Sequence, residues 1–341
     1  MIITQLISYV AVLFLSMIPG VILKKCSLVP EGFGKGLSNL VLYIAQPVLI
    51  VYAYLACESS LSEIWQNALW VLLYSVLAHV LFALVSLLFF RHTEKRRAGM
   101  LRFVSVFANA AFMGIPLVEA LLGAEAAIYA SIYNITFNLF LWTLGVHFCT
   151  DEGRDEDEDG DHDLADRLIH THRQSRIEKS LLKVLVHPVT VASVIGVVCL
   201  LTGVRVDSFE SVGLGFFTDT LAMLRSLVAP LSMVVIGLRL PEISLRGIHK
   251  DAPLWIFLGL RHLLLPLGVV LLCKLPALFG SPLSEIAVTV IVIMASAPAA
   301  TSATMFAEKY DCDAVYVSRL VVVSTAISIA TMPIIVALSQ I

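Results

Sequence analysis

Two prolines inside long apolar segments are the residues of this sequence best placed to create a binding site. Pro298 lies in the stretch ASAPAATSATMFAEKYD, residues 295–311, where Thr301 and Ser302 follow it, and Pro116 lies in an earlier apolar segment. A proline inside a helix removes a backbone hydrogen bond, so the half-helix after it presents unpaired N–H groups and the positive end of its dipole. Two such ends would attract an anion, and we expect these residues to bind substrate.

Charged residues inside the apolar segments favour the same kind of ligand. Arg225 and Arg261 each lie about eight residues inside a segment, roughly 12 Å deep at 1.5 Å per residue. The clear carboxylate at such a depth is Glu119, one turn beyond Pro116. Charges at this depth are costly and are usually functional. Each arginine either attracts substrate or pairs structurally, and Glu119 is a candidate for proton coupling.

Further polar residues in the apolar segments have two interpretations each. Asn134 and Asn138 are one helical turn apart and share a face. Together with Gln46, they either line the substrate cavity or form hydrogen bonds between helices. His79 and His262 either carry protons for coupling or are satisfied structurally.

The composition places these polar residues in a lipid environment. The 341 residues are 58% hydrophobic and 14% charged, with a mean hydropathy of +0.89. Soluble domains are roughly 45–50% apolar and about 25% charged, so this is an integral membrane protein. The six cysteines show no metal-ligand spacing and no phosphate-binding loop appears. We therefore predict no cofactor, no metal centre, no nucleic-acid partner and no transport powered by ATP on this chain.

Ten apolar segments are long enough to cross a bilayer as helices, which takes roughly 20 residues each. They lie at about 4–23, 37–56, 65–90, 101–122, 127–149, 184–203, 216–238, 253–273, 283–307 and 314–338. Strict alternation of apolar and polar residues does not occur, which excludes a transmembrane barrel. The predicted fold class is an all-α integral membrane protein with ten transmembrane helices.

The distribution of basic residues predicts the orientation. Of the 23 lysines and arginines, eighteen lie in or at the margins of five alternate loops, and two lie in the other four loops. Loops rich in Lys and Arg stay in the cytoplasm. We therefore expect a multi-pass protein of the cell (plasma) membrane with both termini outside and the loop at 150–183 in the cytoplasm.

The two groups of five spans resemble each other. GVILKKCSLV…YIAQPVLIVYAYL in the first group is similar to GVVCLLTGVR…SLVAPLSMVVIGLRL in the second, and Pro47 and Pro230 occupy similar places. Pro116 and Pro298 each lie fifteen residues after the expected start of their span. Because five is odd, two such repeats must insert with opposite topology. Inverted repeats with interrupted helices are typical of secondary transporters.

An acidic segment separates the two repeats. We predict a first five-helix repeat at 1–150, an acidic cytoplasmic loop at 151–180 and a second, inverted repeat at 181–341. The stretch DEDEDGDHDLAD, residues 155–166, has the ligand spacing of a calcium-binding loop. Its composition is also that of a solvated linker, so the sequence leaves both interpretations open.

Several motifs resemble the auxin efflux carrier family. NAAFMGIPLVEALLG (109–123) resembles the fourth-span motif of that family, and APAATSATMFAEKYD (297–311) resembles its ninth-span motif. HPVTVASVIG, APLSMVVIGLRL and RHLLLP are also similar to family segments. The family belongs with the bile acid, arsenite and riboflavin transporters. Its bacterial members include malate and malonate permeases, and its plant members export an indole carboxylate.

The resemblance implies an elevator-type carrier. Spans 1, 2, 6 and 7 would form the scaffold, and spans 3–5 and 8–10 a transport unit with a crossover where helices 4 and 9 are broken, at Pro116 and Pro298. Asn109 matches the family's asparagine near the substrate. Ala110 and Ala299 depart from the threonine and glutamine of plant members, which argues against assigning an indole carboxylate as the substrate.

The function that these features favour is a secondary transporter, or permease, for a small organic anion such as a mono- or dicarboxylate. A coupling ion, H⁺ or Na⁺, and a homodimer are compatible with the sequence. A membrane receptor or sensor and an intramembrane enzyme are the alternatives. The enzyme would need a metal-binding HExxH motif or paired aspartates at membrane depth, and the sequence offers neither.

Overall fold

The computed structural model describes residues 2–59, 61–150, 182, 184–242, 248–279, 283–310 and 312–340. Within these residues the structure is helical and contains no strand, only one isolated β-bridge. The predicted all-α fold class is therefore confirmed. The acidic loop at 151–180, with the calcium-loop candidate inside it, lies outside the described residues.

The first half of the chain forms helices that are short where prolines, π-turns or breaks interrupt them. They are α1 (Ile2–Leu15), α2 (Ile18–Lys25), α3 (Phe33–Leu40), the π-turn η1 (Val41–Ala45), α4 (Gln46–Leu55), α5 (Leu61–Phe89), α6 (Lys95–Val106), the π-turn η2 (Ala110–Gly114), α7 (Ile115–Leu122), α8 (Ala124–Phe140), the π-turn η3 (Leu141–Gly145) and α9 (Val146–Thr150).

The second half follows a similar order. It comprises α11 (Pro188–Thr202), α12 (Val206–Ser211), α13 (Gly215–Ser226), α14 (Val228–Arg239), the 3₁₀ turns η4 (Leu240–Glu242) and η5 (Ile248–Lys250), α15 (Ala252–Gly259), the π-turn η6 (Leu260–Leu264), α16 (Leu265–Lys274), the 3₁₀ turn η7 (Leu275–Phe279), α17 (Glu285–Ser296), α18 (Ser302–Lys309) and α19 (Ala314–Ser339).

Six helical segments among the described residues are long and apolar enough to cross a membrane. They are Gln5–Lys25, Phe33–Leu55, Ser62–Phe89, Gly215–Arg239, Ala252–Ala277 and Ala314–Ser339. Shorter apolar helices lie at Ala110–Leu122, Pro188–Thr202 and Glu285–Ser296. The chain is thus an integral membrane protein. Six of the expected spans are confirmed by length and composition, and the arrangement of ten spans as inverted repeats stays a prediction.

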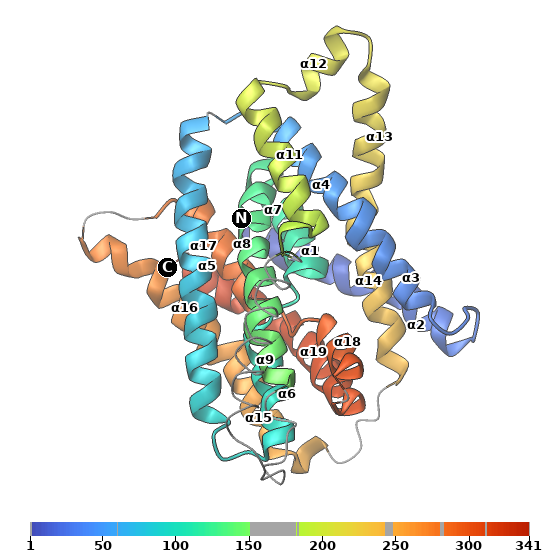
Figure 1. The fold of residues 1–341 in the computed structure, drawn as a ribbon, viewed down its shortest axis with the longest axis vertical. Coiled ribbons are helices and arrows are strands. Elements are labelled where there is room, and N and C mark those ends of the chain that lie inside the picture. The colour runs from blue at the N-terminus through green and yellow to red at the C-terminus, as the bar shows by residue number, and fades with distance from the viewer. Residues whose placement is uncertain are drawn as a thin grey trace, which may run out of the picture.

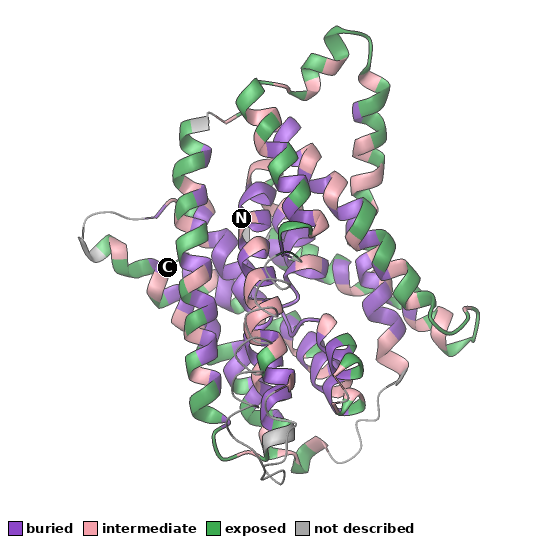
Figure 2. Ribbon diagram, viewed as in Figure 1, coloured by how far each residue is buried: buried purple, intermediate pink, exposed green. Residues whose placement is uncertain are grey.

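The surface is apolar where a soluble protein would be polar. Leu84 in α5 is 62% exposed, Met223 in α13 is 73% exposed and Leu271 in α16 is 67% exposed. These helices lie at the two sides of the molecule in Figure 1, and exposed positions run along their outer faces in Figure 2. Lipid chains solvate such side chains, so these outer faces suit contact with the bilayer.

Two close helix pairs join spans that the family resemblance would place in the scaffold. Gly20 of α2 and Gly237 of α14 face one another, and a Cβ at either position would collide with the backbone of the opposite helix. Gly196 of α11 lies against the ring of Tyr54 in α4 in the same way. Helices in lipid associate through such small residues because packing replaces the hydrophobic effect. α5, α8, α16 and α19 pack around α17.

Candidate functional site

Two helices stop in the middle of the molecule and their ends meet. The backbone N–H of Asn109, just after α6, donates to the carbonyl of Pro298, just after α17, at 2.7 Å. The N–H of Ala300 donates to the carbonyl of Phe107 at 2.8 Å. These two bonds make an isolated antiparallel bridge between the extended segments. Each break therefore satisfies backbone groups of the other, as a region without bulk water requires.

The break in the first half does not lie at Pro116. It lies at residues 107–109, and the chain is helical again from Ala110. Pro116 is the second residue of α7 and follows the wide turn η2, in which the carbonyl of Asn109 accepts from Met113 and Gly114, both at 3.1 Å. A π-turn absorbs the missing N–H of a proline without stopping the helix. The expectation that the first break lies at Pro116 was therefore wrong. Pro298 does lie within the second break, between α17 and α18.

Arg261 lies fully buried at the helix ends that lead into the breaks. Its Nε and Nη2 donate to the carbonyl of Ala297 at 3.1 and 2.6 Å, and Nη2 also donates to Ala295 at 3.0 Å. Its Nη1 donates to the carbonyl of Ser105 at 3.1 Å. One guanidinium thus serves the C-terminal ends of α6 and α17, which carry unpaired carbonyls and partial negative charge. This geometry favours the structural alternative for Arg261 over direct substrate binding.

His262 belongs to a hydrogen-bond chain that holds the second break. The N–H of Ala299 donates to Ser324 Oγ at 2.9 Å, and Ser324 Oγ lies 2.9 Å from His262 Nε2. On the other side, His262 Nδ1 lies 3.0 Å from Thr331 Oγ1, which donates to Ile327. All four contacts are satisfied when Ser324 donates to Nε2 and Nδ1 carries the hydrogen of a neutral imidazole. This geometry favours the structural alternative for His262 over a proton carrier.

His79 has a hydrogen bond and an aromatic environment. Its Nδ1 lies 2.7 Å from the carbonyl of Ser75 in the same helix, and its ring stacks on Phe140 at a centroid distance of 5.2 Å. The ring of Tyr133 lies 5.4 Å away on another side. An aromatic enclosure suits an uncharged imidazole, which matches the structural interpretation more closely than a proton carrier.

Three buried amides near η2 are incompletely satisfied. Gln46 donates from Nε2 to the carbonyl of Ala111 at 2.9 Å, but its Oε1 has no partner among the described residues. Asn109 Nδ2 and both amide atoms of Asn134 likewise have none, although these side chains are at most 2% exposed. Asn109 precedes η2, and α8, which carries Asn134, packs against it. Buried polar atoms without partners are costly, so they indicate a place that water or a ligand fills.

Thr301 and Ser302 mark the start of the half-helix after the second break. Thr301 is the buried N-cap residue of α18 and its side chain makes no capping bond, and Ser302 is the half-buried first residue of that helix. Asn138 differs from the other amides because its Nδ2 donates to the carbonyl of Asn134 at 2.8 Å, within its own helix. Asn138 is therefore satisfied locally.

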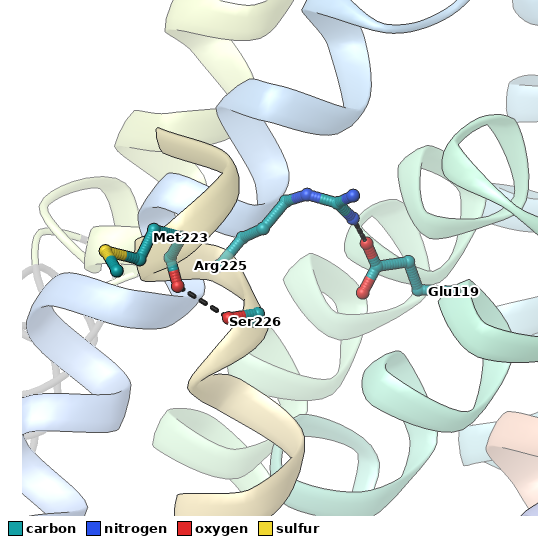
Figure 3. Close-up of polar contacts among 4 residues, drawn as sticks. All are labelled: Glu119, Met223, Arg225 and Ser226. Atoms are coloured by element: carbon teal, nitrogen blue, oxygen red, sulfur yellow. Dashed lines mark hydrogen bonds and ion pairs between the residues drawn. The ribbon is translucent and has the colours of Figure 1, made fainter. Parts of the chain in front are cut away.

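Glu119 and Arg225 form an ion pair across the molecule (Figure 3). Glu119 lies in α7, and Arg225 lies at the end of α13, where its guanidinium also sits over the ring of Tyr52 in α4 at 4.3 Å. The side chains are 18% and 32% exposed, respectively. The sequence offers the two as separate candidates, Glu119 for coupling and Arg225 for substrate attraction, and the structure places them together as partners.

A cavity of about 380 Å³ lies elsewhere, between the N-terminal turns of α6 and α19. Its lining mixes both signs of charge and comprises Glu94, Arg97, Met100, Cys312, Asp313 and Tyr316. It contains none of the incompletely satisfied amides, so we place the candidate site at the breaks and not in this cavity.

The hydroxyl and carbonyl partners that hold the breaks are not predicted from the sequence. Ser324 accepts from Ala299, and the carbonyls of Ser105 and Ala295 receive Arg261. The only sequence signal for Ser324 is its place among other Ser and Thr residues in an otherwise apolar span. A carbonyl has no signal at all, because every residue carries one.

Comparison with known proteins agrees with the membrane fold. The profile of a family described as membrane transport protein matches residues 5–336, nearly the whole chain. A search of curated proteins finds no match. The profile covers both interrupted helices and the residues around them, and it is the membrane transport domain of the auxin efflux carrier type. This chain belongs to the membrane transport protein family.

Proposed function

We propose that the protein is a secondary transporter for a small organic anion, with a mono- or dicarboxylate as the substrate class. The observation that carries the proposal is the asymmetry of the two breaks. Arg261 serves the C-terminal ends of the helices that enter them. The helix that leaves the first break starts beside buried amides that lack partners among the described residues. Negative helix ends are thus neutralised, and positive ends remain available.

The electrostatics favour an anion on the side of the departing helices. A helix N-terminus acts as roughly +0.5 of an elementary charge, and the N–H groups there are ready donors. η2 with α7 supplies one such end after Asn109, and α18 supplies the other after Thr301. A carboxylate would accept from these N–H groups and from Asn109 Nδ2. Gln46 and Asn134 would contribute further polar contacts from neighbouring helices.

An elevator mechanism requires that contacts between the two units can break. Polar contacts join the proposed units at Gln46 with Ala111 and at Arg225 with Glu119. Within the proposed scaffold, by contrast, glycines bring α2 and α14 into backbone contact. Directional polar bonds can re-form with water or substrate, whereas a tight glycine crossing moves as one body. This difference supports motion of the unit that carries the breaks.

The remaining predictions about topology go with this proposal. We propose a plasma-membrane location, both termini outside, a cytoplasmic loop at 150–183 and two inverted five-helix repeats. A homodimer and coupling to an ion, H⁺ or Na⁺, are further predictions. The receptor and enzyme alternatives gain no specific support from the geometry of the described residues.

Ligand-dependent stabilisation of the purified protein tests the proposal. A panel of mono- and dicarboxylates is compared with the matching neutral amides by thermal unfolding, and substrate counterflow in proteoliposomes is measured for those that bind. We expect a carboxylate to stabilise the protein and its amide to have no effect. Equal stabilisation by acid and amide, or a preference for cations, would contradict the assignment.

Asn109→Ala tests the residue at the centre of the site. One polar contact is worth about 0.5–1.5 kcal/mol, so the dissociation constant should rise roughly 2- to 12-fold at 1.4 kcal/mol per factor of ten. Asn138→Ala is the matched control, because Asn138 is an equally buried amide that is satisfied within its own helix. It should leave ligand affinity unchanged. An equal loss of affinity in both variants would contradict a specific role of Asn109 in ligand binding.

A further inference from the structure

The hydrogen bonds of Arg261 occupy a position that a small cation could take. Its guanidinium donates to carbonyls of Ala297, Ala295 and Ser105, all at 2.6–3.1 Å. Two of these carbonyls come from the end of α17 and one from the end of α6. In transporters with interrupted helices, half-helix ends and unwound carbonyls of this kind coordinate coupling cations. Here an arginine side chain uses them.

The charges at this position balance without any added ion. α6 and α17 are each twelve residues long and end at the breaks. Each C-terminus acts as roughly −0.5 of an elementary charge, so two converging ends amount to about −1. The single positive charge of Arg261 offsets them. A sodium ion at the same carbonyls would have to displace the guanidinium or lie beside it as an unbalanced charge.

Among the described residues, the guanidinium of Arg261 contacts backbone carbonyls and an aromatic ring. The side chain is fully buried, and each hydrogen bond described for it goes to a backbone carbonyl. The ring of Phe82 lies 5.4 Å from Cζ and covers the guanidinium. The guanidinium is covalently attached and contacts two helix ends at all times, whereas a dissolved ion would contact them only when bound.

We propose that Arg261 is a resident cation at the breaks, standing where a coupling Na⁺ would otherwise bind, so that this carrier neither binds nor is driven by Na⁺ there. The inference rests on the proposed function, because coupling presupposes transport. It also narrows the choice of coupling ion that the sequence left open. A variant that removes the side chain should convert these carbonyls into a site for a small monovalent cation or for a free guanidinium.

Thermal unfolding of the purified protein in NaCl, KCl and N-methyl-D-glucamine chloride at equal ionic strength provides the first test. Wild type should unfold at the same temperature in all three salts. Arg261→Ala should unfold at a lower temperature and regain part of the loss in NaCl or methylguanidinium chloride, rising with ligand concentration as binding to the native state requires. Asn138→Ala, with Arg261 intact, is the destabilised control and should show no such recovery.

Two results would overturn the proposal. One is selective stabilisation of wild type by Na⁺. The other is a folded Arg261→Ala variant that responds to neither Na⁺ nor methylguanidinium. If Arg261→Ala cannot be purified, Arg261→Lys and Arg261→Met decide the question, because only Lys keeps a cation. A stable Lys variant with an unstable Met variant supports the proposal, and equal behaviour of the two overturns it.

The proposed function fails separately from this inference. Carboxylate binding and counterflow test the substrate, whereas the salt series tests Arg261. Cation rescue of Arg261→Ala without any carboxylate binding would support the proposal for Arg261 and contradict the proposed anion substrate. Carboxylate counterflow that requires a Na⁺ gradient would support the anion substrate and contradict the proposal for Arg261.

Discussion

The ion pair between Glu119 and Arg225 is predicted to hold the two proposed units together in the state described here. Glu119 lies in α7 of the proposed transport unit, and Arg225 lies in α13 of the proposed scaffold. The test changes Glu119→Gln and Arg225→Gln, singly and together. Each change keeps the approximate polarity of the side chain and removes its charge, so the cycle isolates the charge–charge interaction.

The expected coupling energy follows from the exposure of the pair. Unit charges about 4 Å apart attract by about 4 kcal/mol at an effective dielectric constant of 20. Glu119 is 18% exposed and Arg225 is 32% exposed, so water and side-chain entropy reduce this value. Contacting charged residues typically couple by about 0.5–3 kcal/mol, and we expect about 1–2 kcal/mol here. At 1.4 kcal/mol per factor of ten, that shifts an equilibrium between two conformations roughly 5- to 30-fold.

Thermal unfolding and carboxylate counterflow are measured for all four proteins of the cycle. Both single variants should lose stability, and the double variant should lose less than the sum of the two. The swapped pair Glu119→Arg with Arg225→Glu should recover part of the loss. Single effects that add within about 0.3–0.5 kcal/mol would refute the reasoning, because residues that do not interact behave in that way.

Three further outcomes are expected. Pro298→Ala should let α17 continue as a helix through the break, so the protein should insert and fold but lose transport, and uptake at the wild-type rate would contradict the proposed role of the break. Gly20→Ala should lower the unfolding temperature because the new Cβ would meet the carbonyl of Val234 in α14, whereas Gly36→Ala, with open space around it, should not. A single cysteine introduced at Gly160 should resist an impermeant thiol reagent in intact cells, and rapid labelling there would reverse the predicted orientation.

The sequence by itself determined the environment and class of this protein. A chain with 58% hydrophobic residues is suited to fold in lipid. There, apart from a closed barrel, the helix is the structure that satisfies every backbone group of a membrane span. Pro298, with small and hydroxylated neighbours, indicated an interrupted helix for the same reason. The motifs around residues 109 and 297 then identified the family, which the profile match confirms.

Tertiary structure decided how the polar residues are used. The sequence shows that Arg261 is costly in lipid, but its acceptors include the carbonyl of Ser105, which lies 156 positions away in the chain. Glu119 and Arg225 are 106 positions apart and become partners only when α7 and α13 come together. Pro116 could not be distinguished from Pro298 as a break, because a π-turn depends on local packing and not on the proline alone.

The physical reason is that the free-energy cost of a buried polar group depends on its residue type, whereas the partner that offsets this cost depends on the fold. Residue type fixes the free energy needed to place a charge, an amide or an unpaired backbone group in a bilayer, so the sequence reveals where a partner is required. Backbone carbonyls and N–H groups, which every residue type supplies, provide most of the partners in this protein. Which of them comes within hydrogen-bond distance is set by helix crossings such as that of Gly20 and Gly237, and only the folded chain defines those crossings.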